Sequence, residues 1–90
     1  MPTAVAEIMA QAIALHRQGA LAQAAAQYAQ ALQHDPAHAD ALYALAQIAC
    51  HEGRFAEGID FARQVLAIDP QRARAHKLLG KALTGLPLFG

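Results

Sequence analysis

The sequence contains a single cysteine, Cys50, among its 90 residues. One thiol cannot close an internal disulfide, and this excludes the small secreted domains that disulfides hold together. A chain whose only thiol is free fits a reducing compartment. We therefore expect a cytoplasmic protein.

An excess of charge of one sign is also lacking, because seven basic residues balance seven acidic ones and the formal net charge is zero. The chain as a whole therefore has no electrostatic attraction to nucleic acid or to anionic lipid. Its first residues carry no basic segment typical of an export signal, and Glu7 and Gln11 interrupt the apolar run long before it would span a membrane. We expect no nucleic-acid partner and no membrane partner. Only the C-terminal part is uneven: it is basic, because no acidic residue follows Asp69.

Groups suited to catalysis are scarce. The chain has no serine, and we consider Cys50 and Thr84 as candidate nucleophiles. We interpret Cys50 as a small packing residue and place Thr84 at the fraying end of a helix. The sequence contains no glycine-rich loop of the kind that binds phosphate. It also shows no pair of carboxylates in an apolar cleft. We predict no catalytic and no cofactor-binding residue, so that the chain is not itself an enzyme.

The five histidines raise the question of a metal site. His34 and His38 are four residues apart, which on one continuous helix would place both imidazoles on the same face. Pro36 lies between them, however, and belongs to a turn. A zinc site made by His16, Cys50 and His51 is conceivable. Adjacent residues on a helix point about 100° apart, however, and no CxxC or HExxH pattern occurs. We therefore predict no metal site.

Alanine is abundant, at 24 of the 90 residues, and proline is confined to four positions. This composition is typical of helices that end at defined places. Apolar residues at three- and four-residue steps predict helices over residues 4–17, 20–33, 37–51, 55–68 and 72–85. In the last of these, Leu83 falls on the apolar side with Leu78 and Leu79. No segment predicts a strand, and the short connections require antiparallel neighbours, so the expected class is all-α.

The chain also repeats itself. ALQHDP ends at Pro36 and VLAIDP ends at Pro70, 34 residues later, and the segments 5–38 and 39–72 share eight identities at equivalent positions. Three of these are alanines, but the others include Gly19 with Gly53 and the two Asp-Pro pairs, which stand where turns are expected. Such a period indicates a repeat architecture.

The period and these positions resemble the tetratricopeptide repeat family, whose 34-residue unit is a helix–turn–helix with small residues at the helix contacts and a proline near its end. The likeness is carried by Leu42, Leu45, Ala46, Gly53, Phe55, Gly58 and Pro70 in the second unit and by Ile8, Ala12, Gly19, Ala24, Tyr28 and Pro36 in the first. Gln11 departs from the pattern at a normally apolar position. The resemblance implies a right-handed α-α superhelix, or solenoid, of about five antiparallel helices. Residues 1–90 would form one domain, with units at about 5–38 and 39–72 and a partial unit or capping helix at 73–86.

In the family, the first helix of each unit lines a concave groove that holds a peptide. The resemblance places the following residues of this chain in that groove: Met9, Ile13, His16, Tyr43, Gln47, Arg74, Lys77 and Lys81. Met9 and Ile13 are as readily explained as core residues. Such a groove changes from apolar to basic along its length, and it would complement a peptide or protein segment with apolar anchors and an acidic end.

The expected function is therefore a non-catalytic scaffold for protein–protein interaction. Two alternatives stay open: a docking or regulatory segment at the N-terminus of a larger enzyme, such as a bacterial transferase, and a self-assembling module. The apolar residues Leu86, Leu88 and Phe89 have no following helix to cover them. Either a longer chain continues past them, or they fold back on the domain or contact another copy in a homodimer through the C-terminal end.

Overall fold

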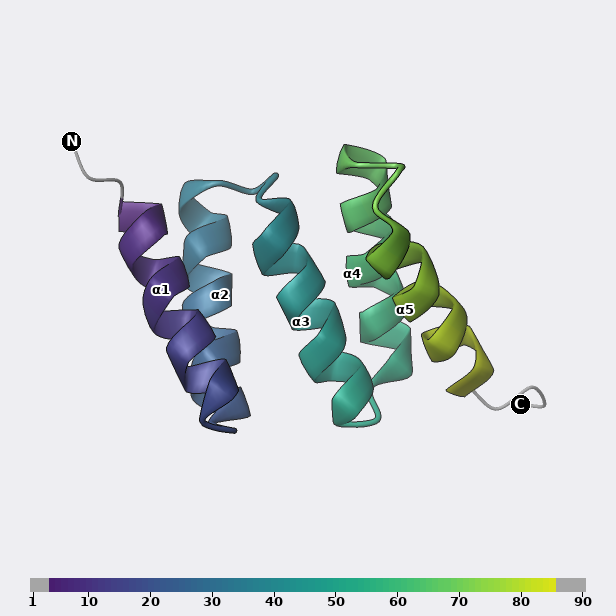
Figure 1. Ribbon diagram of the computed structural model, residues 1–90, viewed down its shortest axis with the longest axis horizontal. Helices are drawn as coiled ribbons and strands as arrows, with labels where there is room; N and C mark the ends of the chain where they lie inside the picture. Colours follow the sequence, from purple (N-terminus) through teal and green to yellow (C-terminus); the bar gives the residue numbers. More distant parts are fainter. Residues whose placement is uncertain (1–3, 86–90) are drawn as a thin grey trace.

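Residues 4–85 are described by the computed structural model, and five α-helices make up nearly all of this range (Figure 1). They are α1 (Ala4–Arg17), α2 (Leu21–His34), α3 (Ala39–His51), α4 (Phe55–Ile68) and α5 (Ala73–Gly85). No strand occurs between residues 4 and 85, and the predicted all-α class is confirmed. The apolar residues Leu86, Leu88 and Phe89, for which a contact with another copy was considered, lie outside the described residues.

The first helix of each hairpin is followed by a glycine that ends it. Gly19 and Gly53 both have a φ of +82°, a left-handed conformation that glycine adopts without the steric penalty of a Cβ. The following amides then turn back onto the helix: the N–H of Ala20 donates to the carbonyl of Leu15 at 2.9 Å, and that of Arg54 donates to the carbonyl of Ala49 at 2.8 Å. The same turn therefore closes α1 and α3, 34 residues apart.

The second helix of each hairpin is followed by an Asp-Pro pair that ends it. Pro36 and Pro70 have no backbone N–H to continue the helical hydrogen bonds. The carboxylate of Asp35 instead accepts from the N–H of Ala37 at 3.2 Å, and that of Asp69 accepts from the N–H of Gln71 at 3.3 Å. The repeated sequence is thus a repeated set of backbone contacts.

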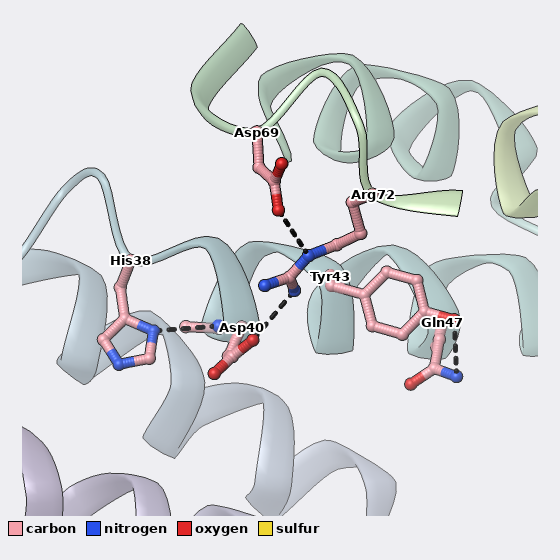
Figure 2. Close-up of polar contacts among 7 residues, drawn as sticks. His38, Asp40, Tyr43, Gln47, Asp69 and Arg72 are labelled. Carbon is pink, nitrogen blue, oxygen red and sulfur yellow. Dashed lines mark hydrogen bonds and ion pairs between the residues drawn. The ribbon is translucent and has the colours of Figure 1, made fainter. Parts of the chain in front are cut away.

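The start of α3 differs by two residues from the predicted start at Ala37. His38 is the N-cap of this helix, and its Nδ1 accepts a hydrogen bond from the N–H of Ala41 at 3.2 Å (Figure 2). This bond satisfies one of the amides that a helix leaves unpaired in its first turn. Residues 35–38 form the Asp-Pro turn, so the helix cannot begin before it.

Small side chains allow the helices to pack closely. Ala12, Ala24, Ala31, Ala46 and Ala62 are all fully buried. Two clusters of apolar residues form the core: the first joins α1, α2 and α3 around Tyr28 and Ile48, and the second joins α3, α4 and α5 around Leu42, Val65 and Ala75. Helix α3 contributes to both, and seven of its 13 residues are buried.

The result is a helical repeat solenoid of two hairpins followed by a fifth helix. In Figure 1, α1 and α5 pass in front of α2 and α4, so that α1, α3 and α5 form one face and α2 and α4 the other. No helix within residues 4–85 has the length and apolar character needed to cross a bilayer.

Leu83, which the helical spacing places on the apolar side of α5, is exposed. Its exposed fraction is 43%. Ala75 and Ala82 of the same helix are fully buried, and Ala75 belongs to the second core cluster with Leu42 of α3 and Val65 of α4, so the apolar side of α5 is only partly covered within residues 4–85.

Candidate peptide-binding groove

A pocket of about 520 Å³ opens on the face formed by α1, α3 and α5, which we call the α1–α3–α5 face. Each of the three helices contributes to its lining, as does the turn between α1 and α2. The lining residues are His16, Gly19 and Leu21, then Gln47, Ile48, Cys50 and His51, and finally Leu78 and Lys81. The pocket therefore combines apolar walls with imidazole, amide and ammonium groups, a mixture that suits a segment of polypeptide.

His16 is held in this pocket by Tyr28 of α2. Its Nδ1 lies 3.1 Å from the Tyr28 hydroxyl, and the two rings meet edge to face with centroids 5.9 Å apart. Tyr28 itself is only 2% exposed, and burial raises the pKa of its phenol. A buried, neutral tyrosine thus fixes the position of a partly exposed histidine.

Cys50 lines the pocket and lies next to α4. A Cβ added to Gly58 of α4 would come within 2.5 Å of the Cys50 Sγ, so the thiol occupies the space that the glycine leaves. Burial raises the pKa of the Cys50 thiol, and the nearby Lys81 ammonium lowers it by a smaller amount. At neutral pH the group is a protonated thiol that packs, and not a nucleophilic thiolate.

Tyr43 and Gln47 lie one helical turn apart on α3. The Gln47 side-chain amide donates to the Tyr43 hydroxyl at 3.4 Å, and Figure 2 shows the two side chains next to each other. The Tyr43 ring packs against the second core cluster and is half-buried, whereas Gln47 is exposed. This leaves the amide of Gln47 accessible at the edge of the pocket.

Three of the eight residues predicted for the groove, His16, Gln47 and Lys81, line this one pocket. Arg74 and Lys77 are exposed on α5 but outside the lining. Met9 is 9% exposed and belongs to the first core cluster, whereas Ile13 is 40% exposed on α1.

The positions carried over from the family did not place Ile48, His51 and Leu78 in the groove, although these residues also line the pocket. Leu78 was placed on the apolar side of α5 by its helical spacing, and the lining of the pocket shows that it is also accessible from the groove. His51 is the last residue of α3, where spacing along a helix no longer tells which way a side chain points.

The histidines and the cysteine do not assemble into a metal site. His16, Cys50 and His51 line the same pocket, yet residues 4–85 contain no group of three His, Cys, Asp or Glu side chains that could hold a metal ion. His38 instead caps α3, and the Nε2 of His76 lies 2.8 Å from the carbonyl oxygen of Pro70.

Comparison with known protein families identifies a matching family. A family model described as "Tetratricopeptide repeat" matches residues 15–82, which is most of the chain: the match includes the end of α1, all of α2, α3 and α4, and the greater part of α5. No curated protein matches the sequence.

Proposed function

The chain belongs to the tetratricopeptide repeat family, and we propose that it is a non-catalytic scaffold that binds a segment of another protein on its α1–α3–α5 face. Repeats of this family generally mediate protein–protein interactions. The observation that supports this site most strongly is the pocket whose lining comes from three helices of successive units. A ligand that spans the pocket contacts all of them, and no single hairpin provides the site.

The chemistry of the lining favours a segment with apolar anchors and an acidic end. Leu21 and Leu78, both partly exposed, provide apolar contact, while Lys81 lies at the α5 side of the pocket. Arg74 and Lys77 extend the positive charge along α5, and no ion pair among the described residues neutralises any of these three cations. A carboxylate at the α5 end of a bound segment would meet an unpaired ammonium group.

Whether the unit acts alone or as the docking segment of a larger enzyme, the same face would carry this function. We place its action in the cytoplasm, where Cys50 stays reduced.

The test is a fluorescence anisotropy titration with two short labelled peptides that share leucine anchors and differ at one end, which is rich in glutamate or in lysine. We expect saturable binding of the glutamate peptide and at least about tenfold weaker binding of the lysine peptide, a difference of about 1.4 kcal/mol. Lys81→Glu should reduce or reverse this preference. Arg63→Glu is the control, because Arg63 is an exposed cation of α4 that lies outside the pocket. Equal affinities of the two peptides, unchanged by Lys81→Glu, would contradict the proposal.

A further inference from the structure

Within residues 4–85, one face of α5 is uncovered where the same face of α3 is buried. Leu42, Ala46 and Ala49 of α3 are between 0% and 2% exposed, because α4 and α5 pack on them. The residues 34 positions later are His76, Gly80 and Leu83 of α5, and all three are exposed. We call these three residues the open face of α5.

Gly80 supports the interpretation of the open face as a helix contact. A glycine inside an exposed helix costs about 1 kcal/mol relative to alanine. A Cβ at Gly80 would touch no atom of residues 4–85 within 4 Å, so packing among these residues does not require the glycine. The equivalent residues one and two periods earlier, Ala46 and Ala12, are fully buried at helix contacts. A small residue at Gly80 has the same use if another helix crosses α5 there.

A second groove lies on the other side of the solenoid, between α2 and α4. Its volume is about 670 Å³, and Leu45 and Phe61 form its apolar part together with alanines of α2 that include Ala26 and Ala29. The small side chains let a helix approach closely.

All the charged residues that line this groove lie on its α4 side, which we call the α4 wall. Glu57 and Asp60 are acidic, and the basic Arg54 is already paired with both Glu52 and Glu57. No ion pair within residues 4–85 involves Asp60. The wall is thus net acidic and complements a cation.

We propose that the open face of α5 of one copy docks into the α2–α4 groove of a second copy. The occupant has the required chemistry: Gly80 and Leu83 provide a small and an apolar contact for the groove floor, and Lys77 borders the open face on one side only. In one orientation of the helix, this ammonium group reaches the acidic wall of α4. Two copies of α5 packed on each other would have no such complement, because α5 contains no acidic residue.

The proposed contact joins two different surfaces, so each copy keeps one free surface and chains of copies can grow. This property gives a sharp test. Leu83→Glu blocks the open face and leaves the groove intact, whereas Ala26→Arg blocks the groove and leaves the open face intact. Both residues are exposed, so the substitutions do not disturb the core. Neither residue lines the α1–α3–α5 pocket, so peptide binding there is tested separately.

The measurement is light-scattering mass after size exclusion over a concentration series. We expect the wild-type mass to rise above the chain mass of 9.5 kDa with concentration and to fall again in high salt. Each variant alone should stay at the monomer mass, and an equimolar mixture of the two should reach twice the chain mass and no more. Ile13→Glu and Gln23→Arg are matched controls, because they place the same charges at exposed positions of α1 and α2 outside both surfaces. Both should associate as the wild type does.

Three outcomes would overturn the proposal. One is a wild type that stays monomeric at the highest concentration. The second is self-association of Ala26→Arg alone, which would mean that α5 pairs with another α5. The third is a mixture of the two variants that remains monomeric. Circular dichroism spectra equal to that of the wild type show that a monomeric variant is folded.

Discussion

The guanidinium of Arg72 lies 2.8 Å from the carboxylate of Asp40, which is 32 residues earlier in the sequence, and this contact joins the start of α5 to the start of α3 (Figure 2). Arg72 also reaches Asp69 at 3.5 Å, in the turn that ends α4. The hydrogen bond to Asp40 is the main reason why the pKa of Arg72 is raised. One period earlier, His38 occupies the position of Arg72 and caps α3 instead. The two junctions between units are therefore stabilised by different contacts.

Removal of the Asp40–Arg72 pair should destabilise the fold only slightly. The Asp40 side chain is 67% exposed, and ion pairs at such positions contribute at most about 1 kcal/mol. Asp40 also lies in the first turn of α3, where a carboxylate interacts with the helix dipole. A double-mutant cycle of Asp40→Ala and Arg72→Ala by urea unfolding separates the two effects. We predict a coupling energy of a few tenths to about 1 kcal/mol; a value of zero would mean that the pair does not form in solution.

Alanine should have opposite effects at two glycines. Gly53→Ala places a Cβ on a residue with a φ of +82°, and we expect it to lower the free energy of unfolding by about 1 kcal/mol or more. Gly80→Ala meets no atom within 4 Å and improves the helix propensity of α5, so it should raise the free energy of unfolding by about 0.5–1 kcal/mol. Thermal and urea unfolding measure both. Shifts of the same sign would contradict the account of the turn.

The contact between α3 and α4 predicts a compensating pair. Gly58→Ala brings a methyl group to within 2.5 Å of the Cys50 Sγ and should cost about 1–3 kcal/mol by overpacking. In a Cys50→Ala background the sulfur is absent, and most of this cost should disappear. An equal cost of Gly58→Ala in both backgrounds would show that the conflict lies with the α3 backbone and not with the thiol.

These contacts show which parts of the structure the sequence predicts. The helices 4–17 and 55–68 were predicted with their observed ends, because Gly19, Gly53 and the Asp-Pro pairs each prevent a helix from continuing. The start of α3 was missed, since His38 is a capping residue of an uncommon kind whose role depends on its tautomer. The exposure of Leu83 was also missed, because the helical spacing identifies an apolar side but does not say whether another helix covers it.

The candidate groove was predicted less completely than the fold. Positions carried over from the family indicate which helices face the ligand, and three of those residues meet in one pocket. Met9 could not be separated from the core in this way, because the depth of a side chain depends on how close the neighbouring helices lie. That distance is set by alanines such as Ala12 and Ala24 on both helices, and no single segment reveals it.

Alkaline pH should destabilise the fold through Tyr28. Burial raises the pKa of this phenol above its usual value, so the folded state keeps its proton at a pH where the unfolded chain loses it. The contribution of Tyr28 to stability is therefore full below about pH 10 and is lost as the pH rises through the folded pKa. In a Cys50→Ala background, which removes a second group whose pKa is raised by burial, Tyr28→Phe should flatten this loss. It should also cost about 1 kcal/mol at neutral pH through the missing hydrogen bond to His16. Thermal unfolding from neutral to alkaline pH tests both; an unchanged alkaline slope would contradict this role of Tyr28.

The most direct test of the central claim is a map of backbone amide chemical shifts of the ¹⁵N-labelled chain, recorded during titration with the glutamate-ended peptide. The account predicts that the largest changes occur on the α1–α3–α5 face, around His16, Gln47 and Lys81, and that the amides of the α2–α4 groove change little. Changes concentrated on α2 and α4, or no change at saturating peptide, would contradict the assignment of the α1–α3–α5 face as the binding site.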